Sequence, residues 1–130
     1  MKKAAVLLFC LALAVLLPLS ALAKVPTEAE AYSSMIAMKA DYPEGMPWTN
    51  DNFYAWHGGI FSGGSGCAGF AYLLSDAAFG TLHAREYTEI DYDALRVGDI
   101  LRINGNTHSV IILEKYSDHV VLAEGRQRTV

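Results

Sequence analysis

The chain has 130 residues, of which 52% are hydrophobic and 18% are charged, and its formal net charge is −4 at pH 7. This length suits one domain, and the composition excludes a disordered acidic tail and a low-complexity chain. An acidic chain without a basic stripe is a poor binder of phosphates, so we expect no nucleic-acid partner.

The first 23 residues have the pattern of a secretory signal peptide. A Met-Lys-Lys start precedes an apolar run over residues 4–17, and Ala21-Leu22-Ala23 matches a small-residue cleavage site. Residues 4–23 are also about long enough to remain as an uncleaved membrane anchor. We favour cleavage because Pro18 interrupts the apolar run. This predicts a protein that is secreted or held in the cell wall, with membrane contact only through the signal segment.

Residues 24–130 would then form a single mature domain with one cysteine, Cys67. No disulfide within the mature chain is expected. A lone thiol on an exported protein is a liability unless it is buried, paired between chains or reactive for a purpose. Cys67 is therefore the first candidate for a functional residue.

Two helices are predicted in the first half of this domain. Thr27 and Glu30 match a capping box, and helical spacing of apolar residues continues from there to about Ala40. Residues 48–66 read as a glycine-rich loop that contains three aromatic residues, Trp48, Tyr54 and Trp56. A second helix is predicted over Cys67–Phe79, where an apolar stripe runs up to a glycine stop at Gly80.

The second half is predicted to be β-structure. Residues 81–98 read as a mixed loop in which Glu86–Ile90 is a candidate short strand. Three runs rich in β-branched residues then predict an antiparallel meander: Asp99–Ile103, His108–Leu113 and His119–Ala123. Asn104-Gly105-Asn106 is a strong turn signal between the first two. The order of helix, loop, helix and meander predicts an α+β domain.

Cys67 is placed at the first turn of its predicted helix. The helix dipole and the unpaired N–H groups at that end favour a thiolate, and the same N–H groups could stabilise an oxyanion. The glycines before Cys67 leave its sulfur open to solvent. A free cysteine is more often a small buried hydrophobe, but export, helix-start position and flanking glycines together favour a nucleophile.

A nucleophilic cysteine needs a base, and the candidates are His57, His83, His108 and His119. If the second hairpin turns about Ser117, Val110 pairs with Glu124, and His108 is the same-face diagonal neighbour of that carboxylate. Glu124 could then hold one imidazole nitrogen while the other faces Cys67. A turn shifted by one residue would put Glu124 on the opposite face, as an ordinary strand-end carboxylate.

Several segments together resemble the CHAP and NlpC/P60 groups of papain-like cysteine amidases and peptidases, which cut amide bonds in bacterial peptidoglycan. These segments are Gly66-Cys67-Ala68-Gly69-Phe70, Leu95–Ile100, Thr107–Ile112 and Glu124, and the resemblance covers about residues 50–124. It implies a papain-like fold with helices packed on the meander, and a secreted cysteine hydrolase without a cofactor. Cys67 carries over as nucleophile, His108 as base and Glu124 as the residue that orients His108. Tyr54 looks like the tyrosine that some NlpC/P60 proteins place near the oxyanion.

Two departures from these groups suggest an alternative function. Family members commonly have an asparagine where Gly125-Arg126 follows the acidic residue, and their chains continue with a further strand over the sheet. The alternative is therefore a non-catalytic remnant that binds cell wall or a partner, with an open sheet edge and an aromatic stacking surface formed by Trp48, Tyr54 and Trp56. No metal-ligand spacing or phosphate loop is visible, so we expect no metal.

Overall fold

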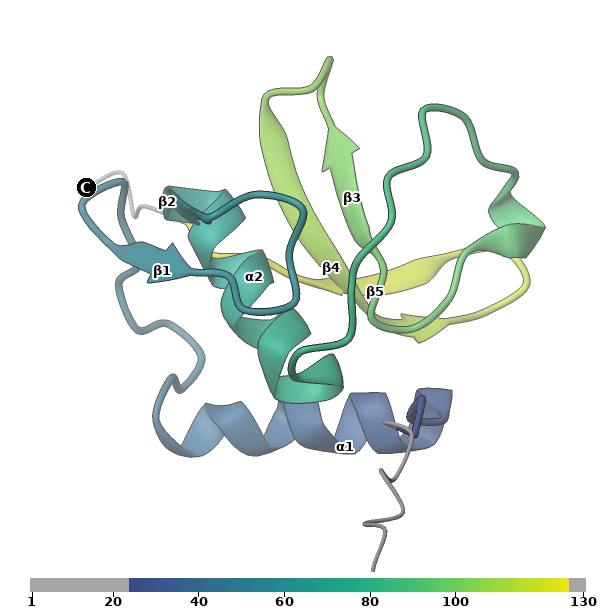
Figure 1. Cartoon of the computed structure of the whole chain (residues 1–130), viewed down its shortest axis with the longest axis horizontal. Coiled ribbons are helices and arrows are strands. Elements are labelled where there is room, and N and C mark those ends of the chain that lie inside the picture. The colour runs from purple at the N-terminus through teal and green to yellow at the C-terminus, as the bar shows by residue number, and fades with distance from the viewer. Residues whose placement is uncertain (1–23, 127–130) are drawn as a thin grey trace, which may run out of the picture.

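The computed structural model describes residues 24–126, so the predicted signal peptide at residues 1–23 lies outside the described residues. Helix α1 (Glu28–Ala37) lies across one end of helix α2 (Gly66–Phe79), and two small antiparallel sheets flank α2 (Figure 1). The predicted α+β class is confirmed. Within residues 24–126, no helix is long and apolar enough to cross a membrane.

The predicted capping box begins α1. The Thr27 hydroxyl accepts the Glu30 N–H at 3.2 Å, and the Glu30 carboxylate accepts the Thr27 N–H at 2.8 Å. The helix buries Ala31 and Met35 against the core. Its last predicted turn, Met38–Ala40, is a 3-10 turn and not α-helix.

The predicted meander is a three-stranded antiparallel sheet of β3 (Ile100–Ile103), β4 (His108–Lys115) and β5 (Val120–Ala123), with β4 in the centre. Asn104 and Asn106 both adopt positive φ in the turn between β3 and β4, as asparagine tolerates. Strand β4 packs on α2, and its residues 109–112 are at most 1% exposed. The core therefore lies between α1, α2 and β4, around Met35, Leu74 and Ile111.

A bulge in β4 decides which residues of the second hairpin face each other. Before the bulge, Ile111 pairs with Ala123 and Ile112 with Leu122, so the predicted register is confirmed there. Beyond the bulge at Leu113 the register shifts by one residue, and Glu114 pairs with Val121. The bulge compensates for the turn, which is centred between Ser117 and Asp118 and not on Ser117. Without it, every β5 side chain near the site would point to the other face.

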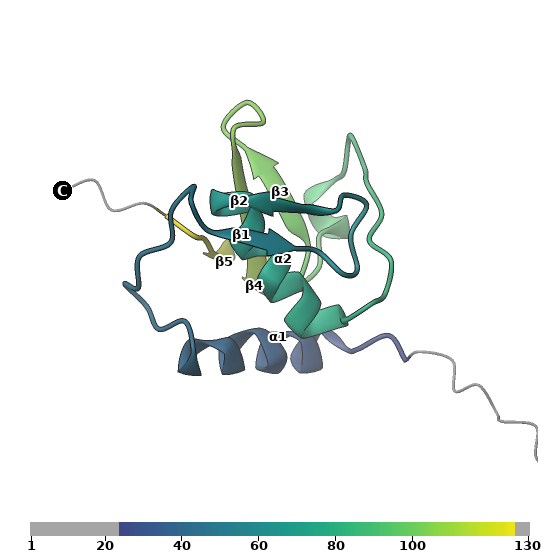
Figure 2. The same cartoon turned by 60° about the vertical axis from the view of Figure 1, so that its left-hand side comes forward.

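Two local predictions are wrong. The predicted loop at 48–66 contains an antiparallel hairpin of β1 (Phe53–Ala55) and β2 (Gly63–Ser65), which packs on α2 (Figure 2). Glycine makes this close packing possible, because a Cβ on Gly69 of α2 would lie 2.4 Å from the Gly64 oxygen. In contrast, Glu86–Ile90 forms no strand and all five residues are exposed.

Candidate active site

Cys67 is the second residue of α2, and the residue before it is held from two sides. Gly66 adopts φ +60°, a conformation suited to glycine. Its carbonyl oxygen accepts the Trp48 indole N–H at 2.7 Å, and its N–H donates to the Asn52 oxygen at 3.0 Å. These contacts fix the start of α2 and present the Cys67 thiol, which is partly buried, at the helix N-terminus.

His108 and Glu124 are in direct contact. His108 is the first residue of β4 and Glu124 directly follows β5, and the imidazole Nε2 lies 2.7 Å from the carboxylate Oε2. The hydrogen bond that the His108 ring donates to Glu124 is the largest influence on His108 and raises its pKa above the ordinary value. Burial opposes this shift, while the nearby Cys67 thiol adds to it. The contact with Glu124 therefore stabilises the protonated form of the imidazole.

The pKa of the Cys67 thiol is shifted in the opposite direction. Burial alone would raise its pKa, but the Ser109 N–H, which donates to Sγ at 3.5 Å, and the imidazole of His108 together lower that pKa below its usual value. Since Glu124 occupies Nε2 of His108, Nδ1 is the nitrogen left for the thiol. Both pKa shifts act in the direction of a thiolate beside an imidazolium, the pair that an activated cysteine nucleophile uses.

One open cleft contains all three groups. Its volume is about 490 Å³, and Cys67, His108 and Glu124 line it together with polar side chains such as Asn50 and Thr107. The structure thus brings the three predicted residues together. The Ser109 N–H and Asn50 were missed at the sequence level, because a backbone donor leaves no sequence signal and Asn50 lies in a turn without a motif.

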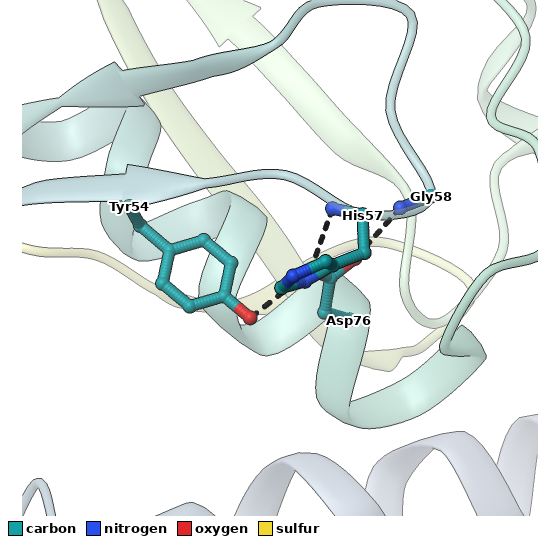
Figure 3. A network of polar contacts seen from close by, with 4 residues as sticks. All are labelled: Tyr54, His57, Gly58 and Asp76. Carbon is teal, nitrogen blue, oxygen red and sulfur yellow. Dashed lines mark hydrogen bonds and ion pairs between the residues drawn. The ribbon is translucent and has the colours of Figure 1, made fainter.

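Tyr54 does not lie beside the Cys67 sulfur. Its hydroxyl donates to the Asp76 carboxylate at 3.0 Å (Figure 3). Asp76 follows Cys67 by nine residues on the same helix, a distance of ~13 Å along its axis. Burial and the Asp76 carboxylate raise the pKa of Tyr54 to about 12. The expected oxyanion role of Tyr54 is therefore corrected: its hydroxyl anchors the β1–β2 hairpin.

Asp76 collects three further donors from the loop after β1. It accepts the His57 backbone N–H at 2.9 Å, the His57 ring Nδ1 at 2.8 Å and the Gly58 N–H at 3.0 Å. Figure 3 shows Tyr54 and His57 converging on this carboxylate. His57 is thereby occupied away from the cleft.

The other two histidines do not line the cleft either. His119 pairs with Asp118 at the turn end of the β4–β5 hairpin, where its ring stacks on Tyr116. His83 is exposed in the loop after α2. Of the four candidate bases, the structure places His108 beside the thiol.

The three loop aromatic residues do not form one open surface. Trp48 is 8% exposed and packs edge-on between Tyr42 and Phe70. The Trp56 ring stacks on Tyr72 with centroids 4.0 Å apart, and Tyr54 is bonded to Asp76. The stacking platform expected for a binding remnant is therefore absent from these residues.

Across residues 24–126, no group of three or more His, Cys, Asp or Glu side chains is placed to hold a metal ion. The cleft chemistry described above comes from a thiol, an imidazole, a carboxylate and amide groups. Compared with known proteins, the chain matches no family model, no curated protein and no solved structure.

Proposed function

We propose that the chain is a secreted cysteine hydrolase that cleaves an amide bond, with a papain-like arrangement of its active site. The observation that carries the proposal is the presence of Cys67, His108 and Glu124 in one cleft, with the pKa of the thiol lowered and that of the imidazole raised. Peptidoglycan is the proposed substrate because the motifs around these residues resemble the CHAP and NlpC/P60 groups.

Cys67 and His108 have distinct roles in the proposed reaction. The Cys67 thiolate attacks the carbonyl carbon, and the Cys67 backbone N–H at the helix start holds the oxygen that becomes negative. His108 gives its proton to the leaving amine as the C–N bond breaks, which leaves a thioester on the sulfur. His108 then takes a proton from the water that attacks the thioester. The C–S bond breaks, which releases a carboxylic acid and restores the thiolate beside the imidazolium.

Glu124 keeps the imidazole in the productive orientation. A carboxylate on Nε2 fixes the orientation of the ring, and it stabilises the imidazolium that gives its proton to the leaving amine. The His108 side chain is 21% exposed, whereas the Glu124 side chain is 39% exposed. Solvent and salt therefore still screen part of the attraction between the two groups.

The test is release of soluble fragments from insoluble peptidoglycan by the exported protein. Wild type should release fragments, whereas Cys67→Ala and His108→Ala should lose release and still bind the wall. The matched control is His83→Ala, because His83 is an exposed histidine outside the cleft. Equal sedimentation of wild type and Cys67→Ala with the wall, without release by either, would instead support the binding remnant.

A further inference from the structure

The turn that precedes the nucleophile carries a side chain without an assigned role. Asn52 closes this turn, because its side-chain oxygen accepts the Thr49 N–H at 2.8 Å and its own N–H donates to the Thr49 oxygen at 3.0 Å. Trp48 and Asn52, on either side of the turn, both bond Gly66. Asn50 is therefore held over the residue that precedes Cys67.

The Asn50 carboxamide lies directly against Gly66. A Cβ built on Gly66 would lie 2.3 Å from Asn50 Oδ1 and 3.3 Å from its Cγ. Asn50 is exposed and lines the cleft together with Cys67 and His108. Among residues 24–126 its side chain has no hydrogen-bond partner, so both N–H donors of the carboxamide are available to a ligand.

We propose that Asn50 supplies a second hydrogen bond to the substrate carbonyl oxygen, in addition to the one from the Cys67 backbone N–H. This inference rests on the proposed function, since it assigns Asn50 to the same thiolate attack. A side-chain amide is a suitable oxyanion donor because it stabilises developing negative charge without being charged itself. Tyr54, the other candidate, is engaged with Asp76.

Two reactions of the same sulfur separate this role from a structural one. p-Nitrophenyl acetate is attacked at its carbonyl, so an oxyanion forms before nitrophenolate leaves and the acetyl thioester remains. Iodoacetamide is attacked at a saturated carbon, so the C–S bond forms as iodide leaves and no oxyanion develops. An oxyanion donor should matter in the first reaction only.

The experiment compares Asn50→Ala with wild type and with Asp51→Ala, which truncates the next exposed side chain of the same turn. Loss of one oxyanion donor typically slows turnover by about 10²–10³-fold. We expect Asn50→Ala to slow acylation on that order, to leave alkylation within about twofold, and to keep the unfolding midpoint of wild type. Asn50→Gln, which retains the donor on a longer chain, should recover part of the acylation rate.

Equal slowing of both reactions in Asn50→Ala, or no slowing of acylation, overturns the assignment of Asn50 while the proposed hydrolase stands. Both proposals would be refuted together by a different result. In that result the wild-type protein is not acylated at Cys67, and Cys67 is alkylated with the pH dependence of an ordinary thiol. A loss of acylation in Asp51→Ala as large as that in Asn50→Ala would also refute a specific role for Asn50.

Discussion

Asp76→Asn tests the contact that holds the β1–β2 hairpin on α2. The Asp76 side chain is 8% exposed and accepts four hydrogen bonds from the hairpin. Three of them reach Oδ2, from the Tyr54 hydroxyl and from the backbone and ring of His57, while the Gly58 N–H reaches Oδ1. Asparagine keeps the shape but replaces one oxygen with an NH₂ group and removes the charge.

The expected loss of stability depends on how the four donors are shared between Oδ1 and Oδ2 of Asp76. In the better orientation, the amide oxygen replaces Oδ2 and its NH₂ group faces the N–H of Gly58, which is buried. A buried donor without a partner costs about 1–3 kcal/mol, and each remaining bond loses the advantage of a charged acceptor. The His57 ring is exposed, so hydrogen bonds to water offset part of the loss of stability there. We expect a decrease of about 2–4 kcal/mol in the free energy of unfolding.

Urea unfolding at neutral pH measures this loss, and pH dependence supplies a second check. Burial alone would raise the pKa of Asp76, but its hydrogen bonds hold that pKa below the usual value. The contribution of the carboxylate is therefore present above the unfolded-state pKa of about 3.9 and disappears as the pH falls through the lower folded-state value. The difference between wild type and Asp76→Asn should narrow in that acidic range.

Two controls bracket the prediction. Tyr54→Phe removes one donor and keeps the carboxylate, so it should cost about 0.5–1.5 kcal/mol. Asp91→Asn changes an exposed aspartate that forms no side-chain cap and should cost less than about 0.5 kcal/mol. A loss for Asp76→Asn no larger than that for Asp91→Asn would refute this account of the network.

Two further substitutions test the region around Glu124. Glu124→Gln removes the charge that favours the imidazolium, so the pKa of His108 should fall toward its ordinary value in an NMR titration. Gly125→Ala would place a Cβ 2.6 Å from the Phe70 Cβ and 2.7 Å from the Trp48 ring, and this overpacking should cost about 1–3 kcal/mol in urea unfolding.

Each of these two substitutions has a matched control variant. Glu114→Gln changes a carboxylate bonded to Tyr116 at the other end of β4, so an equal effect on His108 would contradict the assigned contact. Ser65→Ala changes an N-cap whose side chain makes no cap hydrogen bond, and it should cost less than about 0.5 kcal/mol. A smaller loss for Gly125→Ala than for Ser65→Ala would show that Gly125 is not tightly packed.

The features that could be predicted from the sequence are those with strong local signals. The capping box at Thr27 and the asparagine–glycine turn at 104–106 specify their elements through neighbouring residues alone. Strand β2 could not be predicted, because Gly63-Gly64-Ser65 has little β propensity. It forms because its backbone approaches α2 where glycines on both sides leave room.

The candidate site also combines features that the sequence predicts with features that it does not. The relation between His108 and Glu124 was predicted from a turn about Ser117, and it holds because the Leu113 bulge corrects a turn centred half a residue further on. A bulge of this kind has no dependable sequence signal. Tyr54 was misplaced because its partner, Asp76, reads in the sequence as an ordinary polar helix residue.

The most direct test of the central claim is the pH dependence of Cys67 alkylation by iodoacetamide, with the labelled peptide identified by mass spectrometry. A thiol activated by His108 should react with a midpoint below the free-thiol value of about 8.5, and His108→Ala should move that midpoint upward. A wild-type midpoint at or above the free-thiol value, unchanged by His108→Ala, would contradict the proposed nucleophile–base pair.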